Sequence, residues 1–411
     1  MKLSIYLVLV TSALASVVLT VSAGCDDLGD CWGRGGSTLV ERAENDVAFS
    51  FVEPDLAATR VGDWNLGSCV LLETHFGLFY MQRATGNLYH APLDQPGSLS
   101  LMLAQNEWIG SPLVSAADGG VRDFKRIPSN LSTPDQALAV VALQNPFRQM
   151  VVRIDLFAPF RTQIILDDLP AALTHNGGGL EVFEDGTFAV AIGDLGDPAQ
   201  AAQDGELSGR VLRFTLDGQV PADNPNPGSP EFARGLANPC AIERFHYRRD
   251  PSTTPAGVEF ELLEWVIYDQ AGPATTKLLV LEESADYAIA TTPANSELFI
   301  AELAGHVRGS AYKLAMTFQN LIYDESFERA LFFADSQGGT IHRAQLSRGY
   351  LFEIGESTLS AELAQLPSGA GLFMLAESDR GVLLYTSAGL FELTREWRED
   401  RVVSTASGGC Y

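Results

Sequence analysis

The sequence predicts an all-β fold, and three observations support this prediction. From about Val47 onwards, short apolar runs with alternating polar residues are separated by Gly, Asp, Pro and Asn, as is typical of strands joined by tight turns. Long amphipathic helical patterns are scarce over the same region. A strand, a polar turn and a second strand recur along the chain. The recurring segments are Leu78–Leu93, Phe188–Leu216, Leu298–Leu314, Leu331–Leu346 and Val382–Leu393.

The recurring segments favour a β-propeller among the all-β folds. Gly86 and Gly339 are each followed two residues later by an aliphatic residue, Leu88 and Ile341. This pattern is expected for the outer two strands of a blade, whose turn presents alternating residues to the neighbouring blades. At roughly fifty to sixty residues per blade the length allows six blades, although the uneven spacing does not fix the count. A β-sandwich or a pair of β domains is the alternative.

The first 24 residues resemble an export signal of the lipoprotein type. Lys2 is followed by an uncharged apolar run from Leu3 to Val21 and then by small residues before Cys25. We expect Cys25 to carry lipid and to anchor an exported protein in the periplasm or at the cell surface. Ser22 stands where such signals usually have Leu, so simple secretion is one alternative. A transmembrane anchor is another, because about twenty apolar residues can span a bilayer.

Beyond the signal, residues 25–45 are rich in Gly, Asp and Ser and predict a flexible tether, and residues 46–411 predict the folded body. Four cysteines remain once Cys25 is lipidated, and in an oxidising compartment they can form two disulfides. We expect Cys31 to pair with Cys69 and Cys240 to pair with Cys410. Buried free thiols are the alternative.

The charge of the chain excludes one class of partner. The formal net charge is −25 at pH 7. Nucleic acids and anionic lipid surfaces attract clustered Lys and Arg, so we expect no nucleic-acid partner. Any membrane contact is expected to come from the lipid on Cys25.

The most specific segment runs from Thr174 to Cys240. It contains a His before a Gly pair, a strand, a DG turn, a second strand that ends in GD, a second DG turn, a DNP motif and an NP pair. The residues concerned are His175, Gly177, Gly178, Asp185-Gly186, Gly193-Asp194, Asp217-Gly218, Asp223-Asn224-Pro225 and Asn238-Pro239. In this order they resemble the PQQ-dependent aldose (glucose/sorbosone) dehydrogenase family. Its fold, a six-bladed β-propeller, is what the resemblance implies here.

The resemblance also implies a chemistry for this segment. His175 matches the family's base, which takes the proton of the sugar's anomeric hydroxyl while hydride passes to the quinone PQQ. A neutral imidazole, which titrates near about pH 6.5, suits that role. The implied contacts to the cofactor are Asn176, Arg234 and Asn238. The alternative for His175 is a turn residue bonded to backbone, but the glycines after it indicate a close approach to its backbone.

Calcium is the second implied cofactor. Gly272 and Pro273 match the family's carbonyl ligands, and Ca²⁺ requires oxygen ligands. A plain turn is the alternative, because the acidic pair that follows in the family is here Thr276-Lys277. A different calcium site could use Asp194, Asp197, Asp204 and Asp223, although clustered Asp in such loops is more often turn chemistry.

Several residues depart from the family at positions that hold PQQ, among them Leu372 and Phe373, which stand near the family's late Arg residues. Ala237 and Gln337 stand where the family has Arg and Lys. PQQ carries three carboxylates, whose binding depends on charge-assisted hydrogen bonds from cations. Two functions therefore remain: a sugar dehydrogenase that uses PQQ, and a non-catalytic propeller that binds a carbohydrate or a protein at its mouth. A calcium-dependent lactonase-like propeller is a third, for which no ligand set can be assembled from the sequence.

Overall fold

The computed structural model describes residues 50–51, 56–62, 65–74, 76–92, 95, 98–115, 118–128, 130–131, 135–157, 159–248, 261–272, 275–288, 299–304, 307–311, 330–335, 340–345, 361–365, 372–378 and 381–395. The chain separates into two compact units, Met1–Ala43 and Glu44–Tyr411, and the described residues all belong to the second. The predicted signal over 1–24, Cys25 and almost all of the tether over 25–45 precede this unit. They lie outside the described residues and stay predictions.

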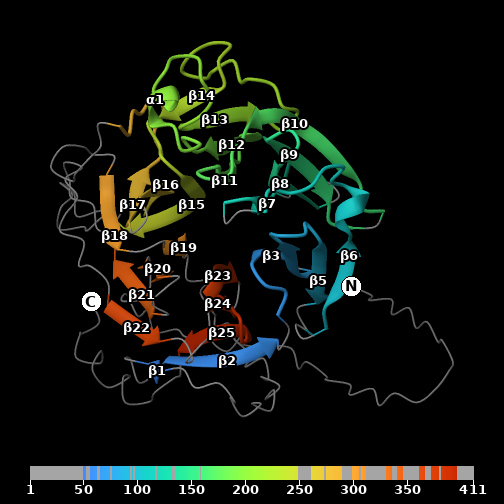
Figure 1. The fold of residues 1–411 in the computed structure, drawn as a ribbon. Coiled ribbons are helices and arrows are strands. Elements are labelled where there is room, and N and C mark those ends of the chain that lie inside the picture. Colours follow the sequence, from blue (N-terminus) through green and yellow to red (C-terminus); the bar gives the residue numbers. More distant parts are fainter. Residues whose placement is uncertain are drawn as a thin grey trace, which may run out of the picture. The chain divides into compact units, whose positions relative to one another are not determined.

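The described strands form six antiparallel sheets (Figure 1). The first three sheets each consist of four consecutive strands. The first contains β3 (Cys69–Thr74), β4 (Gly77–Gln82), β5 (Leu88–Pro92) and β6 (Ser100–Leu103). The second contains β7 (Gly120–Arg126), β8 (Gln136–Leu143), β9 (Arg148–Asp155) and β10 (Thr162–Pro170). The third contains β11 (Gly177–Val182), β12 (Thr187–Ile192), β13 (Arg210–Thr215) and β14 (Glu231–Arg234).

The other three sheets include the two most N-terminal strands. The fourth contains β15 (Pro239–Arg248), β16 (Glu261–Gly272), β17 (Thr275–Val280) and β18 (Phe299–Ala304). The fifth contains β19 (Val307–Ala311), β20 (Ala330–Asp335), β21 (Thr340–Gln345), β22 (Ala361–Gln365) and β1 (Ser50–Phe51). The sixth contains β23 (Leu372–Ser378), β24 (Gly381–Thr386), β25 (Gly389–Arg395) and β2 (Leu56–Gly62). The described helices are short: η1 (Gln105–Glu107) and α1 (Pro198–Ala201).

The sheets follow one another in a closed cycle of contacts. One edge strand of each sheet, which we call its inner strand, contacts the inner strand of the next sheet. The order of these contacts is β3, β7, β11, β15, β19, β23 and back to β3. The N-terminal strand β2 completes the last sheet by pairing with β25, close to the C-terminal end of the described chain. Such radial repetition of antiparallel sheets is the architecture of a β-propeller. The predicted all-β propeller is therefore confirmed.

Four of the five recurring segments correspond to hairpins, but not to those of the strands predicted. Leu78–Leu93 forms β4 and β5, and Leu331–Leu346 contains β20 and β21. These are middle strands of their sheets, so the prediction of the outer two strands is wrong. Middle strands are joined by tight turns and flanked by strands on both sides, which makes their pattern the most regular. Leu298–Leu314 is no hairpin, because β18 ends one sheet and β19 begins the next.

Apolar side chains fill the space between successive sheets. Between the second and third sheets, Val140 and Val151 pack with Leu180, Val190 and Leu212. Similar clusters join the first sheet to the second, the third to the fourth, and the sixth to the first. The first, second and third sheets thus bury both faces against their neighbours, which explains why their middle strands are apolar almost throughout.

Cys69 corrects one expectation about disulfides. It lies in β3, is fully buried and is a free thiol, so the expected pair with Cys31 is wrong. Burial raises the pKa of this thiol to about 12. The hydrogen bond with Tyr385 and the charge of Arg83 lower the pKa, but by less than burial raises it. The alternative of a buried free thiol holds at this position. Cys240 Sγ donates to the carbonyl of Tyr268 at 3.5 Å, and Cys410 lies outside the described residues.

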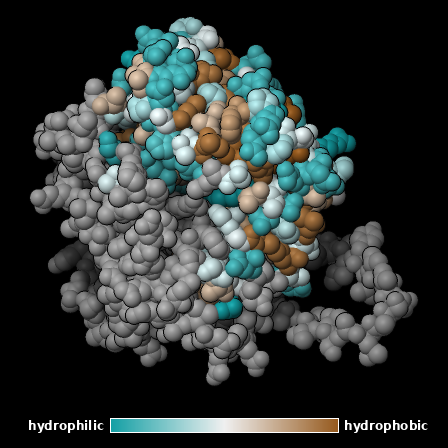
Figure 2. Space-filling view, viewed as in Figure 1, coloured by the Kyte–Doolittle hydropathy of each residue, from teal (hydrophilic) through white to brown (hydrophobic). Residues whose placement is uncertain are grey.

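The described surface mixes polar and apolar residues (Figure 2). Large apolar side chains that are well exposed include Phe76, Leu101, Phe147, Ile164 and Leu173. They come from different loops and strands, so scattered exposure explains them without a binding surface. A helix long and apolar enough to cross a membrane is not found in the described part of the chain.

Three charged side chains from the inner strands β7, β11 and β15 lie close together. Lys125 of β7 lies 2.9 Å from Glu243 of β15 and 3.7 Å from Glu181 of β11, so one ammonium group joins three sheets. One cation cannot neutralise two carboxylates. Burial, together with the charge of Glu243, raises the pKa of Glu181 to about 7 even though Lys125 opposes this.

We predict that Glu181→Gln flattens the dependence of stability on pH. The pKa of Glu181 is raised from 4.5 to about 7, so its favourable contribution is present below about pH 4.5 and is lost as the pH rises through 7. Over that window the wild type should lose up to about 3 kcal/mol that the variant does not lose. Urea unfolding at a series of pH values measures this. The control Asp217→Asn removes a carboxylate that is 86 % exposed and should leave the profile unchanged. A Glu181→Gln profile parallel to that of the wild type would contradict the prediction.

Candidate functional site

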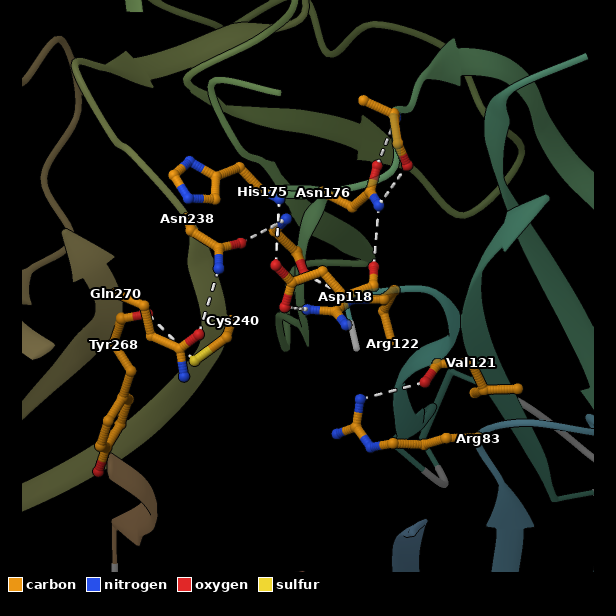
Figure 3. A network of polar contacts seen from close by, with 12 residues as sticks. Arg83, Asp118, Val121, Arg122, His175, Asn176, Asn238, Cys240, Tyr268 and Gln270 are labelled. Atoms are coloured by element: carbon orange, nitrogen blue, oxygen red, sulfur yellow. Dashed lines mark hydrogen bonds and ion pairs between the residues drawn. The ribbon is translucent and has the colours of Figure 1, made fainter. Parts of the chain in front are cut away.

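The candidate site lies at one edge of three neighbouring sheets. His175 and Asn176 directly precede β11, Asp118 precedes β7, and Asn238 precedes β15. Asp194 follows β12, which runs antiparallel to β11 and therefore ends where β11 begins. Strand order thus brings these five residues together, and we call them the His175 cluster. Figure 3 labels all of them except Asp194.

An imidazole and a buried carboxylate form the centre of the cluster. His175 Nδ1 lies 2.7 Å from Asp194 Oδ1. A carboxylate accepts hydrogen bonds, so Nδ1–H donates one to Asp194, which leaves Nε2 of a neutral imidazole as an acceptor. The side chain of His175 is 38 % exposed and that of Asp194 only 6 %. The pair therefore offers Nε2 as a hydrogen-bond acceptor, while Asp194 holds Nδ1 in place.

The backbone of His175 is held in an unfavourable conformation. Its φ is +55°, a left-handed value that few residues other than glycine adopt and that costs on the order of 1 kcal/mol. Two contacts hold it: its N–H donates to Asp118 Oδ2 at 3.1 Å, and its carbonyl accepts from the N–H of Leu195 at 3.2 Å. The second contact links His175 to the residue after Asp194. The two members of the pair are thus fixed through both side chain and backbone.

Protein atoms, not a ligand, pack closely against the glycines after His175. A Cβ atom on Gly178 would meet the side chain of Arg122 at 2.3 Å, and one on Gly177 would meet the backbone nitrogen of Gly193 at 2.6 Å. Arg122 Nε also donates to the carbonyl of Gly177 at 2.8 Å. The close approach predicted from the glycines is present. It brings β7 and the end of β12 against the turn and gives no evidence for a cofactor.

A buried aspartate anchors the segment before β15. Asp269 of β16 is 3 % exposed, and its Oδ1 accepts from the N–H of Asn238 at 2.6 Å and of Ala237 at 3.1 Å. Asn238 Oδ1 in turn accepts from the N–H of Gly177 at 2.9 Å. Burial raises the pKa of Asp269 to about 6, although both backbone donors lower it and the charge of Asp194 adds to the rise.

Two of the three predicted cofactor contacts belong to this network and one does not. Asn176 is fully buried and bonds to backbone atoms of Ala172 and Asp118. Asn238 is also buried, with its side chain between Gly177 and Gln270. Arg234 lies in β14, the last strand of its sheet, and pairs with Asp204 at 3.0 Å and Asp286 at 3.2 Å. The structure does not bring Arg234 into the His175 cluster.

The predicted metal ligands are only partly described. Gly272 ends β16, and Pro273 lies outside the described residues, so calcium at this turn stays a prediction. The alternative site of four aspartates is contradicted, because each has its own partner. Asp194 contacts His175, Asp197 caps α1, Asp204 pairs with Arg234, and Asp223 pairs with Arg213. No group of three metal-ligating side chains occurs among the described residues.

Comparison with known protein families finds a match for the segment that contains three of the five cluster residues. Residues 146–237 match the family model described as Glucose / Sorbosone dehydrogenase. The match contains His175, Asn176 and Asp194. Over this segment the chain is similar to that family. No curated protein sequence matches the chain.

Solved structures of glucose/sorbosone dehydrogenase type share the fold. The PQQ-bound aldose sugar dehydrogenase of Streptomyces coelicolor is 15 % identical, with a TM-score of 0.59, and the match covers 84 % of this chain and 98 % of that one. The soluble aldose sugar dehydrogenase of Escherichia coli, in its apo form, is 14 % identical, with a TM-score of 0.59 and a coverage of 83 % and 100 %. At these identities the likeness shows the fold alone.

The described residues around His175 do not fit the three carboxylates of PQQ. Asp118, Asp194 and Asp269 already place three carboxylates in the network, and Ala237 offers no side-chain donor. The guanidinium group of Arg122 is 3 % exposed, donates to the carbonyl of Gly177 and already pairs with Asp118 at 3.8 Å. A tricarboxylate would therefore meet like charges where the glucose/sorbosone dehydrogenase pattern has Arg. Gln337 lies outside the described residues.

Sequence reasoning missed several residues of the site. Asp118, Arg122 and Asp269 are not singled out by the sequence, and Asp194 is given no role there other than that of a metal ligand. Asp194 could have been found, because the Gly193-Asp194 pair ends a strand that must return beside His175. The other three act across sheets, and no local pattern marks them.

We predict that Gly193→Ala disrupts the cluster. A Cβ atom on Gly193 would lie 2.0 Å from the carbonyl oxygen of His175 and 2.9 Å from that of Ala237, and both neighbours are backbone atoms. The variant should lose about 1 to 3 kcal/mol of stability. Its His175–Asp194 contact should also be displaced. Denaturant unfolding and the ring NMR signals of His175 measure the two effects. Gly110→Ala, at a glycine with open space around it, is the control. Equal stability of the two variants would contradict the prediction.

Proposed function

We propose that this chain is a carbohydrate-binding propeller of the glucose/sorbosone dehydrogenase type, with its sugar site at the His175 cluster. The observation that carries the proposal is the contact between His175 and the buried Asp194. A sugar hydroxyl can donate to Nε2, because Asp194 holds the proton on the opposite ring nitrogen. The pair thus provides a fixed acceptor beside solvent.

The charge of the cluster supports a neutral sugar as its ligand. A neutral polyol does not repel Asp118 or Asp194, and its hydroxyls donate to carboxylates without the desolvation cost of a second ion. The sugar substrates in the names of the similar solved structures agree with this class of ligand. An anionic ligand would need the cation that Ala237 lacks.

The family's oxidation of an aldose is the second candidate function. The same pair favours it, because a base that accepts the anomeric proton must be held in one tautomer, and a buried carboxylate does this. PQQ, when bound in the family, supplies the acceptor of the hydride, and calcium assists it. The described residues do not fit PQQ, so this candidate requires cations from outside the described part of the chain. Binding of a protein at the same site is the remaining alternative.

The setting of this function is part of the proposal. The six sheets would each be one blade of a six-bladed propeller, which the cycle of contacts between inner strands supports. Export, lipid on Cys25, and a location in the periplasm or at the cell surface rest on the sequence of residues 1–25.

We predict that purified protein without its signal binds neutral aldoses and that His175→Ala weakens this binding. Loss of one hydrogen bond to a ligand should lower affinity on the order of tenfold. Calorimetric titration with a panel of aldoses measures it. The control His90→Ala removes a histidine on β5, outside the cluster. Absence of binding to every aldose would sink the proposal.

The same preparation separates the two candidate functions. Protein incubated with PQQ and Ca²⁺ is assayed for reduction of a dye with each sugar that binds. Binding without turnover supports the carbohydrate-binding function, whereas turnover that disappears in His175→Ala establishes the dehydrogenase. Sugar binding that survives unchanged in His175→Ala would remove the site from the His175 cluster.

We also predict that the mature chain begins at a lipidated Cys25. Mass spectrometry of the N-terminal peptide of protein purified from membranes should show the mass of attached acyl chains. Cys25→Ser should release the protein from the membrane fraction, while Cys31→Ser should leave it there. An unmodified N-terminus at or after Cys25 would favour simple secretion instead.

A further inference from the structure

The His175–Asp194 pair is held by a peptide that neither residue belongs to. The carbonyl of Ala237 accepts from the N–H of Asp194 at 2.7 Å. The side chain of the next residue, Asn238, accepts from the N–H of Gly177, two residues after His175, at 2.9 Å. One dipeptide therefore contacts both arms of the pair, Asp194 directly and His175 through its turn.

Asp269 and its neighbour Gln270, whose N–H donates to the carbonyl of Asn238 at 3.1 Å, hold this dipeptide from its other side. Asp269 accepts from the N–H of Ala237, at 3.1 and 3.2 Å to its two oxygens, and from the N–H of Asn238 at 2.6 Å. Gln270, the next residue of β16, accepts from Asn238 Nδ2 at 3.2 Å. Two successive N–H groups on one carboxylate leave the dipeptide little freedom to rotate.

The buried position of Asp269 is energetically unfavourable for a carboxylate. A carboxylate at 3 % exposure loses its hydration, and burial is the largest cause of its raised pKa. Two charged groups act on it from other elements, Lys277 from β17 and Asp194 from the loop after β12. A neutral side chain would avoid the cost of burial, and it would give weaker hydrogen bonds to the dipeptide.

We propose that Asp269 is the positioning residue of the His175 cluster: through the Ala237–Asn238 dipeptide it sets the position of Asp194 relative to His175. No described hydrogen bond joins Asp269 to either member of the pair, so its hydrogen bonds act on the pair through the dipeptide. The inference deepens the proposed function and rests on it for its purpose, because a sugar hydroxyl needs His175 Nε2 in one place.

The test compares Asp269 with a matched carboxylate, Asp123 of β7. Asp123 is 7 % exposed and also accepts two backbone N–H groups, those of Phe124 and Leu180, neither of which belongs to the cluster. The variants are Asp269→Asn, Asp269→Ala, Asp123→Asn and Asp123→Ala, each in the chain without its signal. Nitrogen NMR of the His175 ring reports whether Nδ1 carries the proton donated to Asp194.

We expect Asp269→Ala to lose the protonated Nδ1 signal and Asp269→Asn to keep it, since the amide oxygen still accepts both N–H groups. Asp123→Ala should keep the signal. Persistence of the signal in Asp269→Ala, or its loss in both alanine variants alike, would overturn the proposal. This readout needs no sugar, so it stands even when no aldose binds and the proposed function fails.

Hydrogen exchange covers the case in which Asp269→Ala does not fold. In Asp269→Asn the neutral acceptor is weaker, so exchange at Ala237 and Asn238 should quicken on the order of tenfold at pH above 7. The increase should pass on to the N–H groups of Asp194 and Gly177. Asp123→Asn should instead speed exchange at Phe124 and Leu180 only. An increase in Asp269→Asn confined to Ala237 and Asn238 would show that the dipeptide does not position the pair.

Discussion

The contact between the inner strands of successive sheets is the constraint on which the rest of the structure depends. It brings the starts of β7, β11 and β15 to one edge, so loops that are far apart in the sequence become neighbours. Asp118 reaches the backbone of His175 across one such boundary, and Asn238 reaches Gly177 across the next. The site is therefore a product of blade packing, and small shifts between blades would separate its parts.

The polar groups at these boundaries are buried, so each of them requires a hydrogen-bond partner. Arg122, Asn176 and Asp269 are each almost without solvent contact, and each bonds to backbone atoms of another segment. A buried polar group without its partner costs about 1 to 3 kcal/mol, more if charged. Such groups stabilise one arrangement of neighbouring blades over others. The same reasoning applies to Lys125, which holds carboxylates of two other sheets.

The sequence predicts what is local and misses what crosses between sheets. The Asp185-Gly186 turn and the hairpins follow from short patterns, because turn chemistry acts over a few residues. Asp269 and Asp118 escape, since their partners lie 31 and 57 residues away along the chain. Arg234 shows the opposite error. It stands three residues from Ala237, yet the chain passes from the last strand of one sheet toward the first strand of the next between them.

Ala237 connects the architecture to the question of the ligand. Its backbone is fully used, with the N–H on Asp269 and the carbonyl on Asp194, while its side chain is a methyl group. The Arg that the resemblance implies for this position would make the same backbone contacts and add a cationic side chain. Replacing it by Ala preserves the support of the His175–Asp194 pair and removes only the charge. Because the positioning contacts involve backbone atoms, the scaffold of the pair can remain intact while the affinity for an anionic cofactor falls. The cluster then retains the groups that a neutral hydroxyl requires.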